Sequence, residues 1–575
     1  MNNPTIADFL STFNKIISSF VNNDNENITL YSSVLKDTYN VLNSNERSTC
    51  FQYISDFFNE QNDTYITIFF MSYLLKTLNS AEAIIHIQHT ISQSGISPID
   101  ALNIIFQMSS FSFSTDLKID TADFYKEQLS IYQNNISKLN SLTESYTFVP
   151  YDVRNKDRIA IMCRMLYSDR HAPTVIIINL FNWLKKLGYE VCLFIEYMGQ
   201  IQDENVINWY RPSIENKIFS QAGDFNINYL GVDIKGHNIV FSNSNYEQMA
   251  RRTFDLIYDY NPLFVINVGG CNPIADLCNN ITTVCCMPCI NKPALSTSSI
   301  YIRYFPYTED DDRIYNDLLL NYQHVYDMPF VEELSGSNGC IQVKSDYGID
   351  EDKFAIIIAG NRLDKEIRQR FIQLLNDISS TEDNVVFVFI GDCPLLKNTL
   401  KDCDFYNKCV FTGAVSNFKG AVSIGDLFLN PPRQGGSTGA YYAIECGIPV
   451  LTLPSCDVAS VGNAFTCHTI DEMSDIIHRY MHDSEYMNQQ IQNCRSSFEK
   501  ICSCKDNLPS ITSFISKLKE YMNNGVGNYA YLPTQYVCYN YSGLFLISRQ
   551  IHNYCFMMDC RKELFHNLFS IKSKA

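Results

Sequence analysis

The sequence predicts an α/β protein with two doubly wound parallel sheets that face a cleft, preceded by an all-helical N-terminal region. In the first 150 residues, apolar side chains recur at helical spacing. From Arg158 on, short apolar runs alternate with helical stretches, and a second alternating unit begins at Phe354. Alternating strands and helices are typical of parallel sheets covered by helices on both faces. The chain length of 575 residues leaves room for several domains.

The expected elements divide the chain into four parts. Residues 1–150 form the helical region, with helices at 6–20, 64–79, 81–92 and 122–142 and no clean repeat period. The first sheet domain, 151–335, has strands at 159–163, 190–195 and 263–268 and helices at 173–187 and 247–260. The second, 336–505, has strands at 354–359, 385–390, 409–412, 427–430 and 448–453, and helices at 364–377 and from Asp471 and Ser484. Segment 506–575 is expected to pack back on the first domain.

Net charge, apolar segments and cysteine content exclude some classes of function and predict the location of the protein. A formal net charge of −18 argues against nucleic acid as a main partner, because binding a phosphate backbone requires a basic face. The N-terminus has no signal-peptide pattern, and the most apolar window, 65–75, is too short to span a bilayer, so we expect a cytoplasmic protein. The 21 cysteines are expected to be free, buried thiols. Cys285, Cys286 and Cys289 allow a redox or metal pair, but a buried strand ending at a Pro turn is favoured.

The stretch 430–440 predicts an anion site. Gly435, Gly436, Ser437 and Thr438 link an apolar strand to a short helix that ends at Gly447. Ser437 is expected to cap a helix beginning at Thr438. Small residues before a helix N-terminus leave backbone N–H groups and the positive end of the helix dipole directed at a ligand, which suits a phosphate. No Gly-Lys-Ser/Thr follows, so this is not a Walker loop.

Further cations lie in the loop after the first strand of the second domain. Asn361, Arg362 and Lys365 belong to it, and Arg362 offers a planar fork for phosphate oxygens. A surface ion pair of Lys365 with Glu366 or Asp364 is the alternative. Arg433 flanks the glycine-rich loop and is expected to face the diphosphate or to sit in a surface pair; Gln434 also flanks it.

The first domain offers one catalytic candidate and a glycine pair. His171 precedes Pro173, which suits the first turn of the next helix, and its neutral imidazole could act as a base or hydrogen-bond the donor. A histidine with no role is the alternative. Gly269 and Gly270 follow the strand 263–268; they either let a ligand approach the backbone or form a tight turn.

These segments together resemble the GT-B glycosyltransferases, and among them the O-GlcNAc transferase family and its bacterial relatives. The sequence Ser-Asp-Arg-His-Ala-Pro-Thr at 168–174 is similar to that family's histidine loop, and Asn-Arg-Leu-Asp-Lys at 361–365 to its lysine loop. Residues 436–450, with Leu-Pro at 453–454 and Val-Ala-Ser at 458–460, resemble its threonine-led helix and the following strand and loop. The resemblance covers roughly residues 155–500.

The resemblance implies a GT-B fold of two Rossmann-like domains and transfer of a sugar from a nucleoside-diphosphate sugar, expected to be a UDP-sugar, to a hydroxyl or amide of a protein or glycan. It implies no cofactor and no obligatory metal. Lys365 and Thr438 would bind the diphosphate, and His171 would sit at the reaction centre. Gly413, which ends the strand 409–412, is a further donor-side candidate. Tyr442 replaces the family's ribose-binding carboxylate, and Gln434 and Tyr442 occupy the positions of the glutamate pair of many retaining enzymes.

Two other functions fit the same residues. A sugar-nucleotide epimerase of GT-B type would use the same phosphate site but needs acid and base groups from both domains, of which only His171 is evident. A non-catalytic accessory subunit would keep the fold and bind a partner subunit. Retention of Arg362, Lys365 and Thr438 argues against the accessory role, whereas Tyr442 leaves it open.

Overall fold

The computed structural model describes most of the chain up to Asn524. The described residues are 5–22, 24–59, 64–93, 96–114, 122–164, 166, 171–197, 222–229, 231–241, 245–289, 293–303, 317–319, 322–328, 341–433, 435–454, 456–502 and 507–524. No helix within these ranges combines the length and apolar character needed to cross a bilayer.

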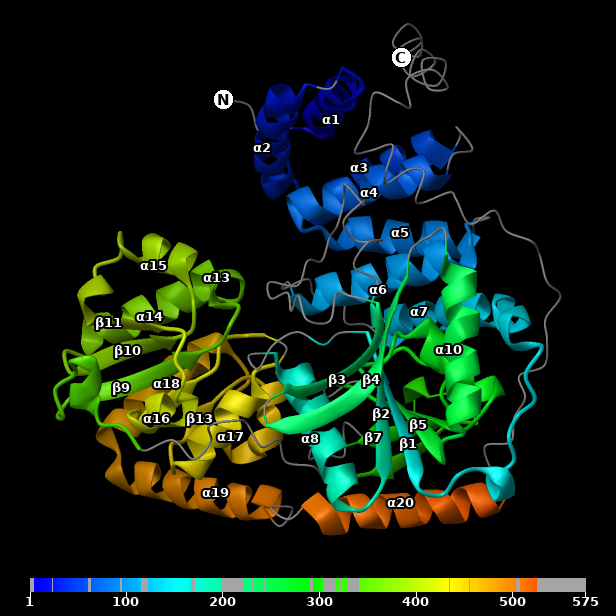
Figure 1. The fold of residues 1–575 in the computed structure, drawn as a ribbon. Helices are drawn as coiled ribbons and strands as arrows, with labels where there is room; N and C mark the ends of the chain where they lie inside the picture. The colour runs from blue at the N-terminus through cyan, green and yellow to red at the C-terminus, as the bar shows by residue number, and fades with distance from the viewer. Residues whose placement is uncertain are drawn as a thin grey trace, which may run out of the picture.

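The N-terminal region is helical, as predicted, and stands above the first sheet domain (Figure 1). Phe9, Phe13 and Ile16 recur on the buried face of the first helix, which a Thr5–Asp8 capping box starts. The helices described in this region are α1 (Ile6–Val21), α2 (Asn25–Val41), α3 (Ser44–Asn59), α4 (Thr64–Leu78), α5 (Ala81–Gln93), α6 (Pro98–Ser114) and α7 (Ala122–Lys138).

The first sheet has the strand order β3-β4-β2-β1-β5-β6-β7-β8. All neighbours are parallel except the β3–β4 hairpin at one edge. Sequence analysis did not predict β3, β4, β7 or β8. The strands are β1 (Arg158–Cys163), β2 (Glu190–Tyr197), β3 (Gly223–Tyr229), β4 (Val232–Val240), β5 (Phe264–Val268), β6 (Val284–Met287), β7 (Ile300–Arg303) and β8 (His324–Asp327).

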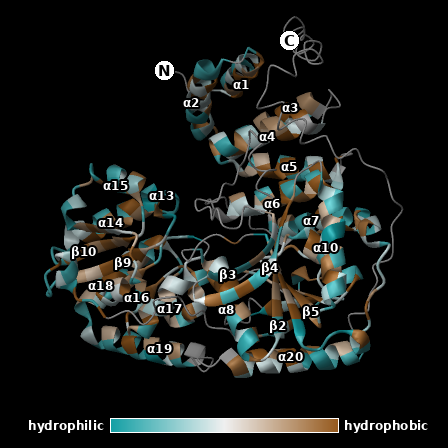
Figure 2. Ribbon diagram, in the orientation of Figure 1, coloured by the Kyte–Doolittle hydropathy of each residue, from teal (hydrophilic) through white to brown (hydrophobic). Residues whose placement is uncertain are grey.

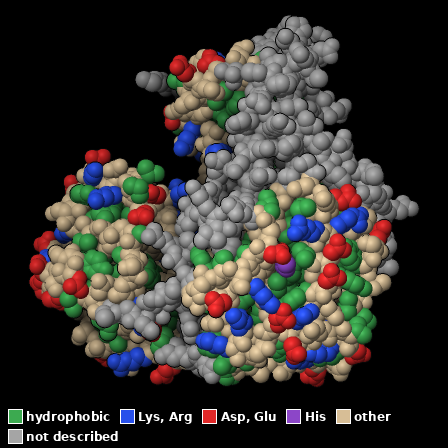
Figure 3. All heavy atoms as spheres, viewed as in Figure 1, with side chains coloured by type: hydrophobic (Ala, Val, Ile, Leu, Met, Phe, Trp, Pro, Cys, Tyr) green, Lys and Arg blue, Asp and Glu red, His purple; other side chains and the backbone are tan. Residues whose placement is uncertain are grey.

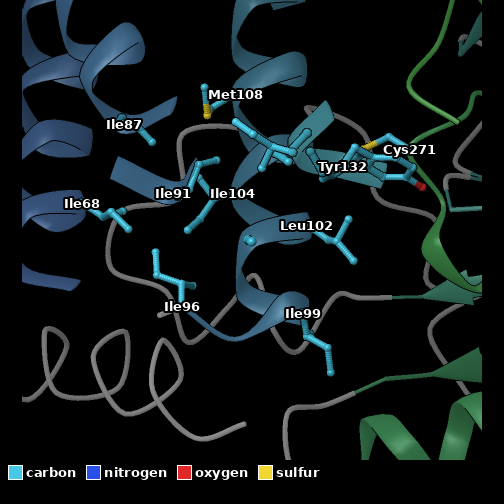
Figure 4. Close-up of a cluster of buried hydrophobic side chains, with 14 of the residues drawn as sticks. Ile68, Ile87, Ile91, Ile96, Ile99, Leu102, Ile104, Met108, Tyr132 and Cys271 are labelled. Atoms are coloured by element: carbon cyan, nitrogen blue, oxygen red, sulfur yellow. The ribbon is translucent and has the colours of Figure 1, made fainter. Parts of the chain in front are cut away.

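Helices cover both faces of this sheet. On one face α8 (Ala172–Lys186) and α20 (Asn507–Asn523) pack on β1, β2 and β5. On the other, α10 (Tyr246–Tyr260) and α11 (Pro273–Leu277) share a core with the N-terminal helices. Figure 4 shows Tyr132 of α7 beside Cys271 at this junction. The Tyr132 hydroxyl donates to Oδ2 of buried Asp276 at 2.7 Å, so the helical region and the first domain share one interior.

The second sheet is fully parallel, in the order β11-β10-β9-β12-β13. Its strands are β9 (Phe354–Ala359), β10 (Val385–Ile390), β11 (Cys409–Gly413), β12 (Leu427–Leu429) and β13 (Val450–Leu451). The apolar strands of both sheets run between amphipathic helices (Figure 2). On one face lie α14 (Gln369–Thr381), α15 (Pro394–Leu400) and α18 (Ile470–His482), and on the other α16 (Phe418–Ser423), α17 (Ser437–Glu445) and part of α19 (Ser484–Cys502).

The topology confirms the predicted fold class, two Rossmann-like domains after a helical region. One predicted helix is wrong in detail. Residues 364–377 do not form one helix, because α13 (Leu363–Glu366) ends at an extended Ile367 and α14 starts after Arg368. From α19 under the second domain, α20 returns to the first (Figure 1).

The cysteine thiols and the distribution of surface charge relate to two predictions made from the composition. Cys285 and Cys286 lie in the buried strand β6 as free thiols, as the favoured alternative predicts. Among the described side chains on the face seen in Figure 3, basic and acidic groups are interspersed without a continuous basic stripe.

Candidate functional site

The candidate residues gather where strand order reverses in each sheet. In the second sheet the chain runs β9-β10-β11 in one direction and β12-β13 in the other, so the switch point lies between β9 and β12. In the first sheet it lies between β1 and β5. His171 follows β1 and Gly269 follows β5, while Arg362 follows β9 and the glycine-rich loop follows β12. Carboxyl ends of strands at a switch point are the usual ligand site of open α/β sheets.

A buried arginine joins the two loops of the second domain. Arg433 donates through Nε to Oδ1 of Asn430 at 2.7 Å, through Nη1 to Oε2 of Glu366 at 2.9 Å and through Nη2 to the carbonyl of Ala359 at 2.7 Å. Its side chain is 4% exposed and that of Glu366 8%, so the ion pair is interior. Arg433 is thus neither in a surface pair nor directed at a ligand through its guanidinium nitrogens, each of which bonds within the domain.

Two glycines enclose this guanidinium. A Cβ added to Gly360 would lie 2.2 Å from Nη1 of Arg433, and one added to Gly436 would lie 2.7 Å from Nη2. Gly436 also has a φ of 92°, which side-chain-bearing residues rarely adopt. The turn after β9 and the start of α17 are therefore neighbours on the same edge of the sheet.

The start of α17 differs from the sequence expectation. The helix begins at Ser437 with Gly436 as N-cap, so no side chain of the described residues caps it. The Ser437 hydroxyl is instead buried without a hydrogen-bond partner in the described structure. The Gly435 N–H donates to Oδ2 of Asp457 at 2.8 Å. Gly447, with a φ of 76°, follows the last turn of the helix as predicted.

The β9 turn, residues 360–366, carries two cations that differ in exposure. Arg362, whose side chain is 26% exposed, pairs through Nε with Oε1 of Glu366 at 2.9 Å. One buried carboxylate, that of Glu366, therefore pairs with two guanidinium groups. Lys365 and Asn361 are exposed, and the Lys365 ammonium forms no ion pair or hydrogen bond with any described residue. The expected alternative, a Lys365–Glu366 surface pair, is thus absent from the described part of the chain.

His171 lies across from this turn, on the first domain. It is the N-cap of α8, with Pro173 in the first turn as predicted, and its Nδ1 lies 2.8 Å from the Thr174 hydroxyl. Burial, together with the positive charge of Arg362, lowers the pKa of His171 to about 4. The imidazole is therefore neutral at pH 7.

Four other predicted residues lie in the described part of the chain. Gly270 packs on protein, because an added Cβ would lie 2.3 Å from that of Ala294, which fits the tight turn; a Cβ on Gly269 would lie 4.0 Å from Sγ of Cys289. Gly413 ends β11 with a φ of 66°. Tyr442 is buried in α17, its ring 5.9 Å from that of Phe418. Gln434 and residues 168–170 of the histidine loop lie outside the described residues.

Sequence reasoning missed the two carboxylates that organise the site. Glu366 was considered only as a surface partner of Lys365, and Asp457 not at all. A signal existed for the first, because Glu366 stands four residues after Arg362, the spacing of an ion pair along one helix face. Asp457, which contacts Gly435, lies 22 residues further along the chain, and no local pattern indicates that contact.

Comparison with known proteins yields only distant likenesses. No family model matches the chain, and no curated protein matches its sequence. An O-GlcNAc transferase mutant from Thermobaculum terrenum aligns over 92% of this chain and 100% of its own, at 10% identity and a TM-score of 0.45. Sucrose-phosphate synthase from Thermosynechococcus elongatus aligns over 63% and 99%, at 9% identity and 0.46. Anabaena HepE in complex with UDP and glucose aligns over 63% and 99%, at 10% identity and 0.42. These likenesses do not identify what the chain acts on.

Proposed function

We propose that this protein is a glycosyltransferase that moves a sugar from a nucleoside-diphosphate sugar, with UDP as the expected leaving group, to a hydroxyl or amide of a protein or glycan. The observation that supports it is the meeting of the β9 turn and the α17 N-terminus around buried Arg433. In this proposal, cationic side chains and a helix N-terminus would bind the diphosphate together at the switch point of the second sheet.

The chemistry follows from where charge develops. As the bond between sugar and diphosphate breaks, the departing diphosphate gains negative charge. Arg362 and Lys365, which belong to the turn that neighbours the start of α17, would stabilise that charge more than they stabilise the bound donor. A charge-assisted hydrogen bond of this kind contributes about 1.5–3 kcal/mol. In this proposal the protein's own cations stabilise the leaving group.

His171 is proposed to lie at the reacting sugar. A pKa of about 4 makes its imidazole a weak base in the free protein. A bound diphosphate would offset the charge of Arg362, which is the smaller cause after burial, and would therefore raise the pKa of His171 in part. Donor binding would thereby prepare His171 to accept a proton from an acceptor hydroxyl or to hydrogen-bond the donor.

The helical region, which is joined to the first domain, is proposed to recognise the acceptor. Tyr125 donates to the carbonyl of Pro293 at 2.8 Å, and Tyr132 contacts Asp276, so α7 is fixed to the first sheet domain. A rigid attachment would hold an acceptor in a constant orientation toward His171. Holding the reacting groups in a fixed orientation lowers the barrier to transfer.

A panel of nucleoside-diphosphate sugars, each with and without protein and glycan acceptors, tests this function. We expect release of nucleoside diphosphate that depends on an acceptor, together with incorporation of label from the sugar. Interconversion of sugar nucleotides without an acceptor would support an epimerase instead. Failure to bind any nucleotide would support an accessory subunit.

A further inference from the structure

A histidine pair and a carboxylate meet on the second domain, away from the candidate donor site. His478 and His482 stand one turn apart on α18, and Glu382 is the C-cap residue of α14. Oε1 of Glu382 lies 2.7 Å from Nδ1 of His478 and 2.7 Å from Nε2 of His482. The three potential ligand atoms all lie within 4.8 Å of one another.

We propose that Glu382, His478 and His482 form a binding site for a divalent transition-metal ion such as Zn²⁺. Two imidazoles and one carboxylate form a ligand set that Zn²⁺ uses in proteins, with a remaining position for water or another ligand. Imidazole nitrogen favours Zn²⁺, Ni²⁺ or Co²⁺ over Mg²⁺, which prefers oxygen ligands. In tetrahedral coordination the ligand atoms stand about 3.3 Å apart, so small side-chain rotations would admit the ion.

Neighbouring groups orient the ligands as metal sites require. Nε2 of His478 lies 3.4 Å from the Thr381 hydroxyl, which leaves Nδ1 for the ion. Lys408 donates to the backbone carbonyls of Glu382 and Ser379 at 2.8 and 2.9 Å, and so fixes the end of α14. The Glu382 side chain is 11% exposed, whereas that of His482 is 64% exposed, so the site opens to solvent on one side. Metal-binding imidazoles usually have a hydrogen-bond partner for the ring nitrogen that does not bind the ion, and the Thr381 hydroxyl takes that place beside His478.

The position of the cluster predicts a structural role. Glu382 precedes β10, whereas the candidate donor loops follow β9 and β12, so the two sites lie at opposite ends of the parallel sheet. The ion would connect α14 to α18, two helices that share one hydrophobic core on the same face of the second sheet, with Ile378 and Ile477 among its buried residues. We therefore expect metal binding to stabilise the second domain, whether or not the chain transfers sugar.

Titration of the full chain with Co²⁺ tests the site. We expect saturation at a single equivalent, absorption typical of nitrogen and oxygen ligands, and a higher midpoint of thermal unfolding. His482→Ala, a change at an exposed side chain, should weaken Co²⁺ binding about tenfold or more and remove the thermal shift. Exposed His468 of the same domain supplies the matched control, and His468→Ala should bind as the wild type does.

Three results would overturn the proposal. The first is the absence of saturable Co²⁺ binding. The second is equal binding by the wild type, His482→Ala and His478→Ala. The third is intense near-ultraviolet charge-transfer absorption, which would place the ion on cysteine thiolates instead. Mg²⁺, used in parallel, should leave both the spectrum and the unfolding midpoint unchanged.

Discussion

The guanidinium of Arg433 and the carboxylate of Glu366 form an ion pair of 2.9 Å inside the second domain. Arg433 belongs to the loop before α17 and Glu366 to α13, so the pair joins the two loops proposed to hold the diphosphate. Glu366 also pairs with Arg362 at 2.9 Å. The partly exposed Arg362 therefore shares its carboxylate partner with the buried Arg433.

Loss of the buried guanidinium should destabilise the second domain. Arg433→Met leaves the buried Glu366 with Arg362 as its remaining partner, so the free energy of unfolding should fall by at most about 3–5 kcal/mol, the cost of leaving a buried charge unpaired. Arg370→Met is the control, because Arg370 and Asp471 form a pair with side chains 65% and 77% exposed. Its effect should stay below about 1 kcal/mol. Hydrogen exchange of second-domain peptides measures both variants, and similar losses would argue against the role of Arg433.

The close approach of Gly436 to Arg433 predicts an unequal pair of glycine substitutions. Gly436→Ala and Gly447→Ala both place a side chain at positive φ, 92° and 76°. At Gly436 the added Cβ meets the Arg433 guanidinium, whereas at Gly447 it meets no described atom within 4 Å. We expect Gly436→Ala to weaken UDP binding and to lower stability by more than the roughly 1 kcal/mol backbone strain of Gly447→Ala. Calorimetry and thermal unfolding compare the two, and equal effects would refute the packing argument.

His171 should titrate well below an ordinary histidine. The neutral form is favoured in the folded chain, so the free energy of unfolding should fall as the pH drops from about 6.5 toward 4, where the unfolded state binds the additional proton. NMR of ¹³C-labelled histidines, with His171→Gln for assignment, measures the pKa. Saturating UDP should raise it, because the diphosphate offsets the charge of Arg362. A pKa that UDP leaves unchanged would show that His171 does not lie at the donor site.

The role of His171 at the reacting sugar predicts a loss of turnover. His171→Ala should reduce the rate of sugar transfer more than it reduces the affinity for nucleotide.

The sequence predicts those parts of the structure that neighbouring residues determine, and it does not predict contacts between residues far apart in the chain. Strands β9 and β10 match their predicted bounds, because continuous apolar runs flanked by Gly and polar residues identify buried parallel strands. The hairpin β3–β4 was missed; its β3 strand alternates half-buried and exposed residues at a sheet edge. The order of strands and helices predicted that Arg362 and His171 lie in segments that follow strands. The role of Arg433 did not, since its partners Ala359 and Glu366 are far away in sequence.

The most direct test of the account compares UDP binding by Lys365→Ala and Lys353→Ala in calorimetry. Lys365 is exposed on the β9 turn, whereas Lys353 precedes β9 at the opposite end of the sheet, where its ammonium lies 3.4 Å from the Asp383 carbonyl. We predict that Lys365→Ala weakens UDP binding at least tenfold, about 1.4 kcal/mol, while Lys353→Ala binds as the wild type does. Equal affinities in the two variants would contradict a diphosphate site between the β9 turn and the start of α17.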